Sequence, residues 1–370
     1  MGNNYCSANS FSSRIYCCHR ISHSMALGMG WGDSVYCFGV VLFGLELGTI
    51  PLERLFGNFR PLGIAGCSFY AQLDIQKTVA NAIKDYMRKN KPSKTAYKVA
   101  LSVITLGAKP GMDKILPLGI VEATDKLLVA SGAVGARGVR WSRSQRMVSV
   151  YEAFDWMLPG QFEAFAHRKA FCERQVKEGI GAGANQVLVL GAGYDTMGWR
   201  LAPEFAGVNF FEIDHPSTAR LKARGIKAMG PRDNLCLIAE DLGDRKLVDI
   251  LKANELWDQS ARTVIIAEGL VMYLSPEAVR DLFCQCGVIV GAGSRIAFSY
   301  IPTGADGRPD AGRWTGLMLW LQKVVGEPWT WSIRPEELSL FLEKSGWINA
   351  PELAGATGMH GIEFFVVAKK

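Results

Sequence analysis

The sequence predicts a doubly wound α/β fold, in which helices cover both faces of a mostly parallel sheet. Three observations support this prediction. Residues 187–190 form a short, uninterrupted apolar run, which is typical of a central strand that is buried on both faces. Residues 191–193 read Gly-Ala-Gly, so the chain can turn sharply there and a ligand can approach the backbone closely. From this point on, strand-like and helix-like segments alternate along the chain.

An acidic residue stands at the end of each of the next three expected strands, namely Asp214, Asp241 and Glu268. The carboxyl ends of parallel strands meet at one edge of the sheet, and folds of this kind bind their ligands at that edge. We therefore expect these three side chains to share a site. The expected strands after the first are 208–213, 235–239, 263–267, 295–300 and 361–368, with helices over 276–286 and 335–344.

The glycine pattern indicates the class of ligand. Residues 191–196 read Gly-x-Gly-x-x-Thr, so the third glycine of a dinucleotide fingerprint is missing. Such a loop need not hold a pyrophosphate, and it suits an adenosine ligand without phosphate, such as S-adenosylmethionine. Asp195 and Thr196 stand where the cap of the following helix is expected, although Asp195 could equally bond within its own loop.

The bulk composition narrows the classes of partner. The net charge of +6 is modest for 370 residues, and the densest basic run, 88–94, fits a solvated helix end better than a nucleic-acid surface. The apolar run 35–45 is too short to span a bilayer. The nine cysteines are odd in number and form no Cys-x-x-Cys pair, which favours reduced thiols in an intracellular compartment. We therefore expect no nucleic acid, no membrane span and no metal.

The chain divides into three expected regions. Residues 1–53 are a poorly defined N-terminal extension, and a transit-peptide-like composition makes an organelle the alternative to a cytoplasmic location. Residues 54–180 are helical, with candidate helices over 76–87 and 94–106 and another that begins after Pro159-Gly160. Residues 181–370 form the ligand-binding core. The oligomeric state does not follow from the sequence.

Four blocks in this order resemble the signature blocks of the leucine carboxyl methyltransferase-like family: LGAGYDTMGWRL, FEIDHP, EDL and AEGLVMYL. This family belongs to the class I S-adenosylmethionine-dependent methyltransferases, and the resemblance covers roughly residues 160–300. It implies a Rossmann-like, seven-stranded, mostly parallel sheet with an antiparallel last strand. It also implies a helical N-terminal cap and an insertion after the fifth strand, for which the Trp-rich segment 301–334 is the candidate.

The resemblance implies roles for the residues that bind the methionine part and the ribose of the cofactor, S-adenosyl-L-methionine. Arg168 occupies the place of an arginine that holds the methionine carboxylate, a role that suits the two-bond geometry of a guanidinium. Gly191 and Gly193 lie under the cofactor. Asp214 accepts hydrogen bonds from the ribose hydroxyls, and Glu212 remains the alternative for this role.

The resemblance also assigns the adenine and the reacting end of the cofactor. Asp241 and Leu242 lie beside the adenine, where the acid accepts from the exocyclic amine, although Asp241 could instead cap a helix. Glu268 lies near the amino group, where positive charge favours a carboxylate. Tyr273 could face the methyl group and is the candidate catalytic residue, with ordinary packing as the alternative.

The expected reaction is O-methylation of a carboxylate or hydroxyl on a small molecule or a peptide C-terminus. The sequence offers few candidate bases among its five histidines, of which His167, His215 and His360 are the nearest to the motifs. This scarcity favours a carboxyl acceptor, which needs no base. A nicotinamide-dependent oxidoreductase and a catalytically inactive nucleoside-binding module are the alternatives. The oxidoreductase lacks support because the third glycine and a Tyr-x-x-x-Lys pair are absent.

Overall fold

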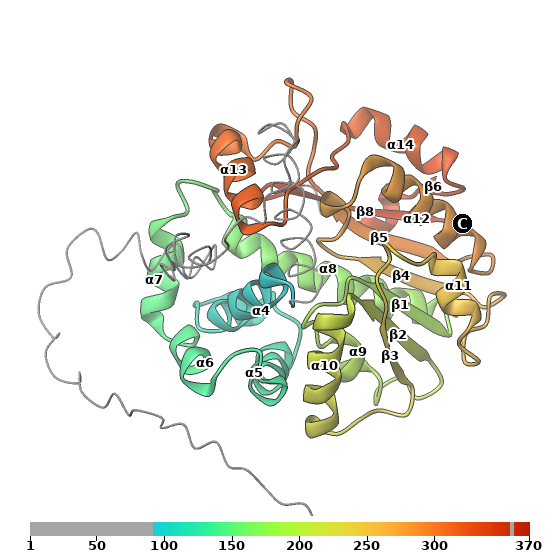
Figure 1. Cartoon of the computed structure of the whole chain (residues 1–370), viewed down its shortest axis with the longest axis horizontal. Coiled ribbons are helices and arrows are strands. Elements are labelled where there is room, and N and C mark those ends of the chain that lie inside the picture. Colours follow the sequence, from blue (N-terminus) through green and yellow to red (C-terminus); the bar gives the residue numbers. More distant parts are fainter. Residues whose placement is uncertain (1–91, 356–358) are drawn as a thin grey trace, which may run out of the picture.

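The computed structural model describes residues 92–355 and 359–370 and contains one mixed sheet. The predictions for residues 1–53 and for a helix over 76–87 lie outside the described residues. Seven strands follow one another across the sheet in the order β3-β2-β1-β4-β5-β8-β6, and the two-residue β7 pairs with β8 beside this path. The predicted seven-stranded α/β class is therefore confirmed. Figure 1 shows α4 to α7 and α13 on one side of the molecule and the sheet on the other, with α8 between them.

The parallel part of the sheet is built outward from β1, residues Gln186–Leu190. This strand pairs in parallel with β2 (Asn209–Asp214) on one side and with β4 (Thr263–Ala267) on the other. Strand β3 (Leu235–Ala239) extends the sheet beyond β2, and β5 (Arg295–Tyr300) extends it beyond β4. These strand bounds agree with the sequence prediction to within one residue.

The last strand runs against the others. Strand β8 (Glu363–Lys369) pairs antiparallel with β5, with the short β6 (Ile348–Asn349) and with β7 (Met359–His360). It begins two residues later than predicted, because Gly361 and Ile362 form the turn between β7 and β8. The amino end of an antiparallel strand lies at the edge where the parallel strands have their carboxyl ends, so Glu363 faces the ligand edge of the sheet.

Both faces of the sheet are buried, as the apolar run of β1 predicts. Leu188 and Leu190 face a core that helices α11, α12 and α14 complete, whereas Val187 and Val189 face a second core under α8, α9 and α15. Adjacent side chains of a strand point to opposite faces, so a strand covered on both sides needs apolar residues throughout. The helices are α8 (Gln161–Gly181), α9 (Met197–Leu201), α11 (Leu247–Lys252), α12 (Pro276–Val288), α14 (Pro335–Lys344) and α15 (Pro351–Ala354).

Most of the remaining helices lie on one side of the molecule, beside the sheet (Figure 1). Helix α4 has the predicted bounds, Lys94–Leu106, and Ser93 caps it by accepting a hydrogen bond from the Ala96 amide at 3.1 Å. Helix α10 (Pro216–Met229) joins α4 and α5 in a separate apolar cluster. The other elements of this region are η2 (Met112–Lys114), α5 (Ile120–Ser131), α6 (Ala136–Ser142), α7 (Gln145–Ala153), η3 (Val271–Tyr273), η4 (Gly312–Trp314) and α13 (Thr315–Val325).

Helix α8 joins the helical region to the sheet. It begins after Gly160, whose φ of 72° lies in the left-handed region that glycine adopts without strain. Phe162 and Ala166 pack among α4, α5 and α7, while Phe171 and Val176 pack on the sheet. Arg168 and its neighbour Lys169 therefore lie at the junction between the two packing regions.

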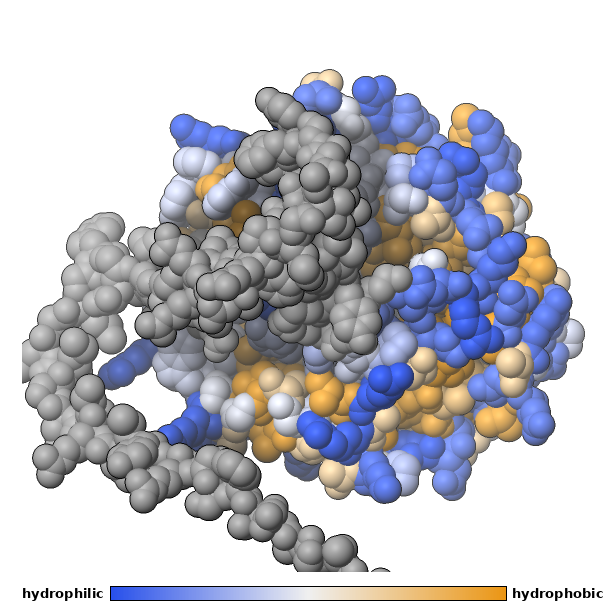
Figure 2. Space-filling view, viewed as in Figure 1, coloured by the Kyte–Doolittle hydropathy of each residue, from blue (hydrophilic) through white to orange (hydrophobic). Residues whose placement is uncertain are grey.

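The outer surface around α11 and α14 is mostly hydrophilic (Figure 2).

No helix among residues 92–355 and 359–370 combines the length and the apolar character that a membrane crossing requires.

Candidate functional site

A cavity of about 450 Å³ lies at the carboxyl edge of the parallel strands, where the sequence predicts the ligand. Its lining comes from the ends of β1 and β2, from the loops after β1, β2, β3 and β4, from α4, α5, α8 and η3, and from the segment after α13. All eight predicted site residues line this cavity: Arg168, Gly191, Gly193, Asp214, Asp241, Leu242, Glu268 and Tyr273. Their roles stay predictions, but their shared location follows from the fold.

The loop after β1 brings backbone to the cavity at two glycines. Gly191 and Gly193 have φ angles of 64° and 49°, in the region that side chains other than glycine rarely adopt. A Cβ atom on Gly193 would also lie 3.2 Å from the Cβ of Ala96 in α4. The Gly193 amide donates a hydrogen bond of 2.5 Å to Oδ2 of Asp214, which ties the loop to the end of β2.

The structure separates the two candidates for the ribose acid. Asp214 is half-buried and lines the cavity, and burial raises its pKa although the Gly193 amide opposes the rise. Glu212 points away into the fold, where its carboxylate pairs with Lys222 of α10 at 2.6 Å and is 3% exposed. Because Glu212 lies outside the cavity lining, the geometry favours Asp214 for this role.

The loop after β3 forms the side of the cavity assigned to the adenine. Oδ1 of Asp241 accepts a hydrogen bond from the Gly243 amide at 2.8 Å, so this acid orders its own turn. It caps no helix, since α11 begins only at Leu247. His215 caps α10 by accepting from the Ser217 amide at 3.3 Å and lies 3.6 Å from Asp241, in keeping with a structural role.

Beneath the methionine end of the predicted site lies a buried ion network of five side chains. Arg168 Nε donates to Glu268 at 3.0 Å, and its Nη1 donates to Glu363 at 2.7 Å. Lys169 binds Glu268 at 2.9 Å and also pairs with Asp195. The network holds two cations and three carboxylates, so its net charge is minus one. We call these five residues the ion network: Arg168, Lys169, Asp195, Glu268 and Glu363.

For three groups of the ion network, pairing with an opposite charge outweighs the cost of burial. Burial disfavours the charged form of Arg168, but Glu363 and Glu268 outweigh this effect and raise its pKa. The pKa of Lys169 is raised in the same way by Asp195 and Glu268. Burial would raise the pKa of Asp195, yet Lys169 holds it well below its usual range. The partners thus favour the charged forms of both cations and of Asp195 at neutral pH.

Sequence reasoning missed two members of this network, Lys169 and Glu363. Lys169 directly follows Arg168 in the sequence of α8. This pair of adjacent basic residues could have indicated that both belong to the site. Glu363 stands at the amino end of the antiparallel β8, so a search for acids at the carboxyl ends of strands passes over it. Asp195 accepts a hydrogen bond from the Met197 amide at 2.6 Å, which is the expected bond within its own loop. It also forms an ion pair with Lys169.

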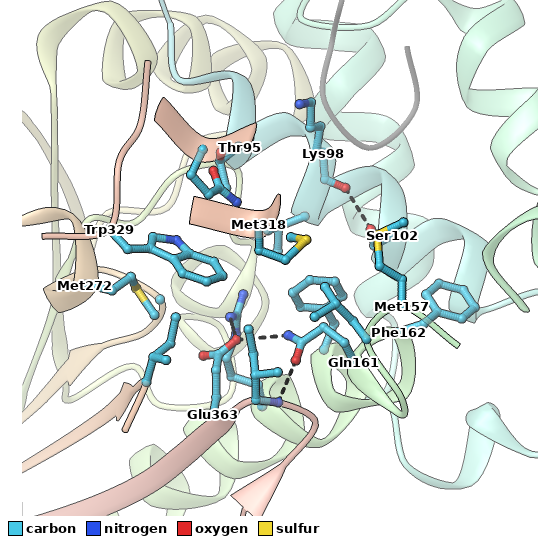
Figure 3. A pocket seen from close by; sticks show the side chains of 18 of the residues that line it. Thr95, Lys98, Ser102, Met157, Gln161, Phe162, Met272, Met318, Trp329 and Glu363 are labelled. Atoms are coloured by element: carbon cyan, nitrogen blue, oxygen red, sulfur yellow. Dashed lines mark hydrogen bonds and ion pairs between the residues drawn. The ribbon is translucent and has the colours of Figure 1, made fainter. Parts of the chain in front are cut away.

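A second cavity, of about 170 Å³, adjoins the first and is lined mainly by apolar side chains. Arg168, Gly269 and Tyr273 line both cavities and so stand between them. Figure 3 shows Phe162, Met318 and Trp329 around this second cavity, with Gln161 and Glu363 at one end and Lys98 at the other. We call the first the nucleoside cavity and the second the acceptor cavity.

Of the three candidate histidine bases, His215 lines the nucleoside cavity, where it caps α10, whereas the other two lie outside both cavities. His167 and His360 stack on each other with ring centres 4.2 Å apart, and neither ring is part of the lining of the two cavities. Burial and the neighbouring His167 lower the pKa of His360. Among the described residues, no group of three or more histidine, cysteine or acidic side chains is arranged to hold a metal ion.

A family model and several known proteins match the part of the chain that contains the motifs. Residues 127–287 match the family model described as "Leucine carboxyl methyltransferase". A protein of Mycolicibacterium paratuberculosis named "Putative S-adenosyl-L-methionine-dependent methyltransferase" is 32% identical over 178 residues, which cover 47% of this chain and 56% of that protein. A protein of the same name from Mycobacterium marinum is 34% identical over 149 residues, covering 40% and 47%.

The matches to these relatives are partial, since the chain spans about half of the length of each. Among solved structures, a "putative methyltransferase" from Thermobifida fusca aligns with a TM-score of 0.48 and 15% identity, covering 70% of this chain and 97% of that one.

Proposed function

Because residues 127–287 match the leucine carboxyl methyltransferase family model, we propose that the chain is an S-adenosylmethionine-dependent methyltransferase. The observation that supports this best is the pairing of two adjoining cavities. One is lined by the glycine loop and the strand-end acids, and the other is apolar. Such a pair provides one place for a nucleoside and another for an acceptor, with Tyr273 and Arg168 at their junction.

The charge of the ion network fits the proposed cofactor. S-adenosylmethionine carries a carboxylate, an ammonium and a sulfonium at neutral pH, and its net charge is therefore plus one. The ion network has the opposite net charge and is almost entirely buried, so water screens the attraction little. Glu268 would hold the ammonium. Arg168 and Lys169 would hold the carboxylate, since both line the nucleoside cavity.

At the other end of the cavity, Asp214 would accept the ribose hydroxyls, and Asp241 with the Leu242 backbone would bind the adenine. When bound, S-adenosylmethionine supplies a methyl group on a sulfur that leaves readily. The protein then has to exclude water and align an acceptor, and positioning of this kind contributes most of the catalysis. The apolar walls of the acceptor cavity, including Phe162, Met318 and Trp329, suit both tasks. We propose O-methylation of a small molecule or a peptide C-terminus as the reaction.

The first test is calorimetric titration of the protein with S-adenosylmethionine. We expect Asp214→Ala to weaken binding by about 1–3 kcal/mol, because the ribose hydroxyls lose their acceptor. Asp306→Asn, in an exposed turn, is the control and should bind as the unmodified chain does. Undiminished affinity in Asp214→Ala would show that the ribose acid is misassigned. Tight binding of NAD with no binding of S-adenosylmethionine would refute the proposed function.

A further inference from the structure

One carboxylate oxygen in the acceptor cavity has no donor. Glu363 is 4% exposed and lines the cavity, and its Oε1 accepts from Arg168 at 2.7 Å and from Gln161 at 3.2 Å. Its Oε2 is buried and has no hydrogen-bond partner among the described residues. A buried carboxylate oxygen without a donor is costly, so its retention calls for an explanation.

The surroundings hold this carboxylate in place. Gln161 Oε1 accepts from the Ile362 amide at 2.9 Å, which orients the amide so that its Nε2 faces Glu363. The preceding turn is closed by Gly361, where a Cβ atom would lie 2.3 Å from Gln161 Oε1. Arg168 and Gln161 thus both bind the same oxygen of Glu363, at one end of the acceptor cavity (Figure 3), and neither donates to the other oxygen.

We propose that Glu363 selects an acceptor that carries a hydroxyl on an apolar, ring-sized body, and that it receives the acceptor's proton. This inference rests on the proposed function and narrows it against a carboxylate acceptor. An acceptor hydroxyl would donate a hydrogen bond to Glu363 Oε2, which accepts none from the described residues. The apolar side chains around it would enclose the rest of the molecule.

The proton and charge balance agrees with a neutral acceptor. The acceptor oxygen would form a bond to the methyl carbon, the methyl–sulfur bond would break with its electron pair remaining on sulfur, and the displaced proton would go to Glu363. The loss of the sulfonium charge is thus matched by protonation of the ion network, and the buried site has the same total charge before and after transfer. A carboxylate acceptor would add a negative charge next to the buried carboxylate of Glu363.

Lys98 is the residue that would favour a carboxylate acceptor instead. It lines the same cavity, and burial lowers its pKa to about 8, so it is mainly charged at neutral pH. Figure 3 shows its amino end at the opposite end of the cavity from Glu363 and pointing away from it. Glu363 therefore favours a hydroxyl acceptor and Lys98 favours a carboxylate acceptor, and one set of ligands can distinguish the two.

Binding of three probes of one shape provides the test: 2-naphthol, naphthalene and 2-naphthoate, measured by equilibrium dialysis against the full chain with S-adenosylhomocysteine. We expect 2-naphthol to bind at least about tenfold more tightly than the other two, the effect of one hydrogen bond to a charged acceptor. Glu363→Gln should remove this preference. The control is Glu352→Gln in α15, where the carboxylate pairs with Lys369 of β8 outside the cavity. This variant should retain the preference for 2-naphthol.

Three results would overturn the inference: 2-naphthoate binding as tightly as 2-naphthol, an unchanged preference in Glu363→Gln, or no binding of any probe. Loss of 2-naphthoate binding in Lys98→Met would then assign acceptor selection to Lys98. The ranking of the probes on the unmodified chain decides the matter even if Glu363→Gln does not fold. Binding of S-adenosylhomocysteine is measured separately, so a failure of the proposed function is distinguished from a failure of this inference.

Discussion

At the scale of single residues, burial decides what Tyr273 can contribute. Its side chain stands between the two cavities, and burial raises its pKa to about 12, with Glu327 adding to the rise and Trp329 partly offsetting it. The phenol therefore keeps its proton throughout the neutral range and cannot act as a base there. It can donate a hydrogen bond or form a wall of the cavity, which limits the catalytic role that the sequence predicts for it.

We therefore expect Tyr273→Phe to lower the rate of methyl transfer by about tenfold or less, the usual effect of losing one neutral hydrogen bond. The shape of the pH–rate profile between pH 6 and 9 should not change, because the phenol does not titrate there. The measurement is the rate of S-adenosylhomocysteine release across this range. A new or missing inflection in the variant would show that Tyr273 exchanges a proton during the reaction.

At the scale of elements, one carboxylate joins α13 to α4 above the nucleoside cavity. Glu327 follows α13, and its Oε1 accepts from the Ser93 hydroxyl at 3.0 Å and from the Lys94 amide at 3.2 Å. Its Oε2 accepts from both the amide and the hydroxyl of Thr95. These amides form the first turn of α4, where the helix dipole also favours a negative charge. Ser93, Thr95 and Glu327 all line the cavity, so this contact is part of its cover.

Loss of this contact should open the cavity. We expect Glu327→Ala to cost about 1–2 kcal/mol of unfolding free energy, as the loss of a helix cap does, and to speed the release of S-adenosylhomocysteine several-fold. Stopped-flow release kinetics and thermal unfolding measure the two effects. Glu337→Ala, in the first turn of α14 and exposed, provides the control. If release from Glu327→Ala is as slow as from the unmodified chain, the contact stabilises the fold without gating the cavity.

At the scale of the whole molecule, the local sequence predicted the sheet because its strands are buried on both faces. The apolar runs of β1 and β4 and the glycine loop are local patterns, and they appear where the sequence places them. The ion network is different, because it joins α8 with residues about 100 and 195 positions away. No local pattern specifies such pairs. The position of Glu363 depends on the antiparallel direction of β8, which the family resemblance implies but no local pattern of the sequence specifies.

The network's net charge leads to a prediction for the site as a unit. S-adenosylmethionine exceeds S-adenosylhomocysteine by one positive charge, so removing one carboxylate should weaken the first ligand more than the second. We expect Glu268→Gln to shift the ratio of the two affinities by about tenfold against S-adenosylmethionine, the size of one charge-assisted interaction. Calorimetry of both ligands gives the ratio, and Glu277→Gln, exposed at the start of α12, is the control.

The ratio is informative even though Glu268→Gln also disturbs the pairing of Arg168 and Lys169. A general loosening of the site would weaken both ligands equally, because they share the adenosine and the amino-acid groups. Only the sulfonium distinguishes them, so a change in the ratio reports on the electrostatic environment of the sulfur. Equal losses for the two ligands would contradict the role of the ion network as a counter-charge to the methyl donor and would restrict it to holding α8 against the sheet.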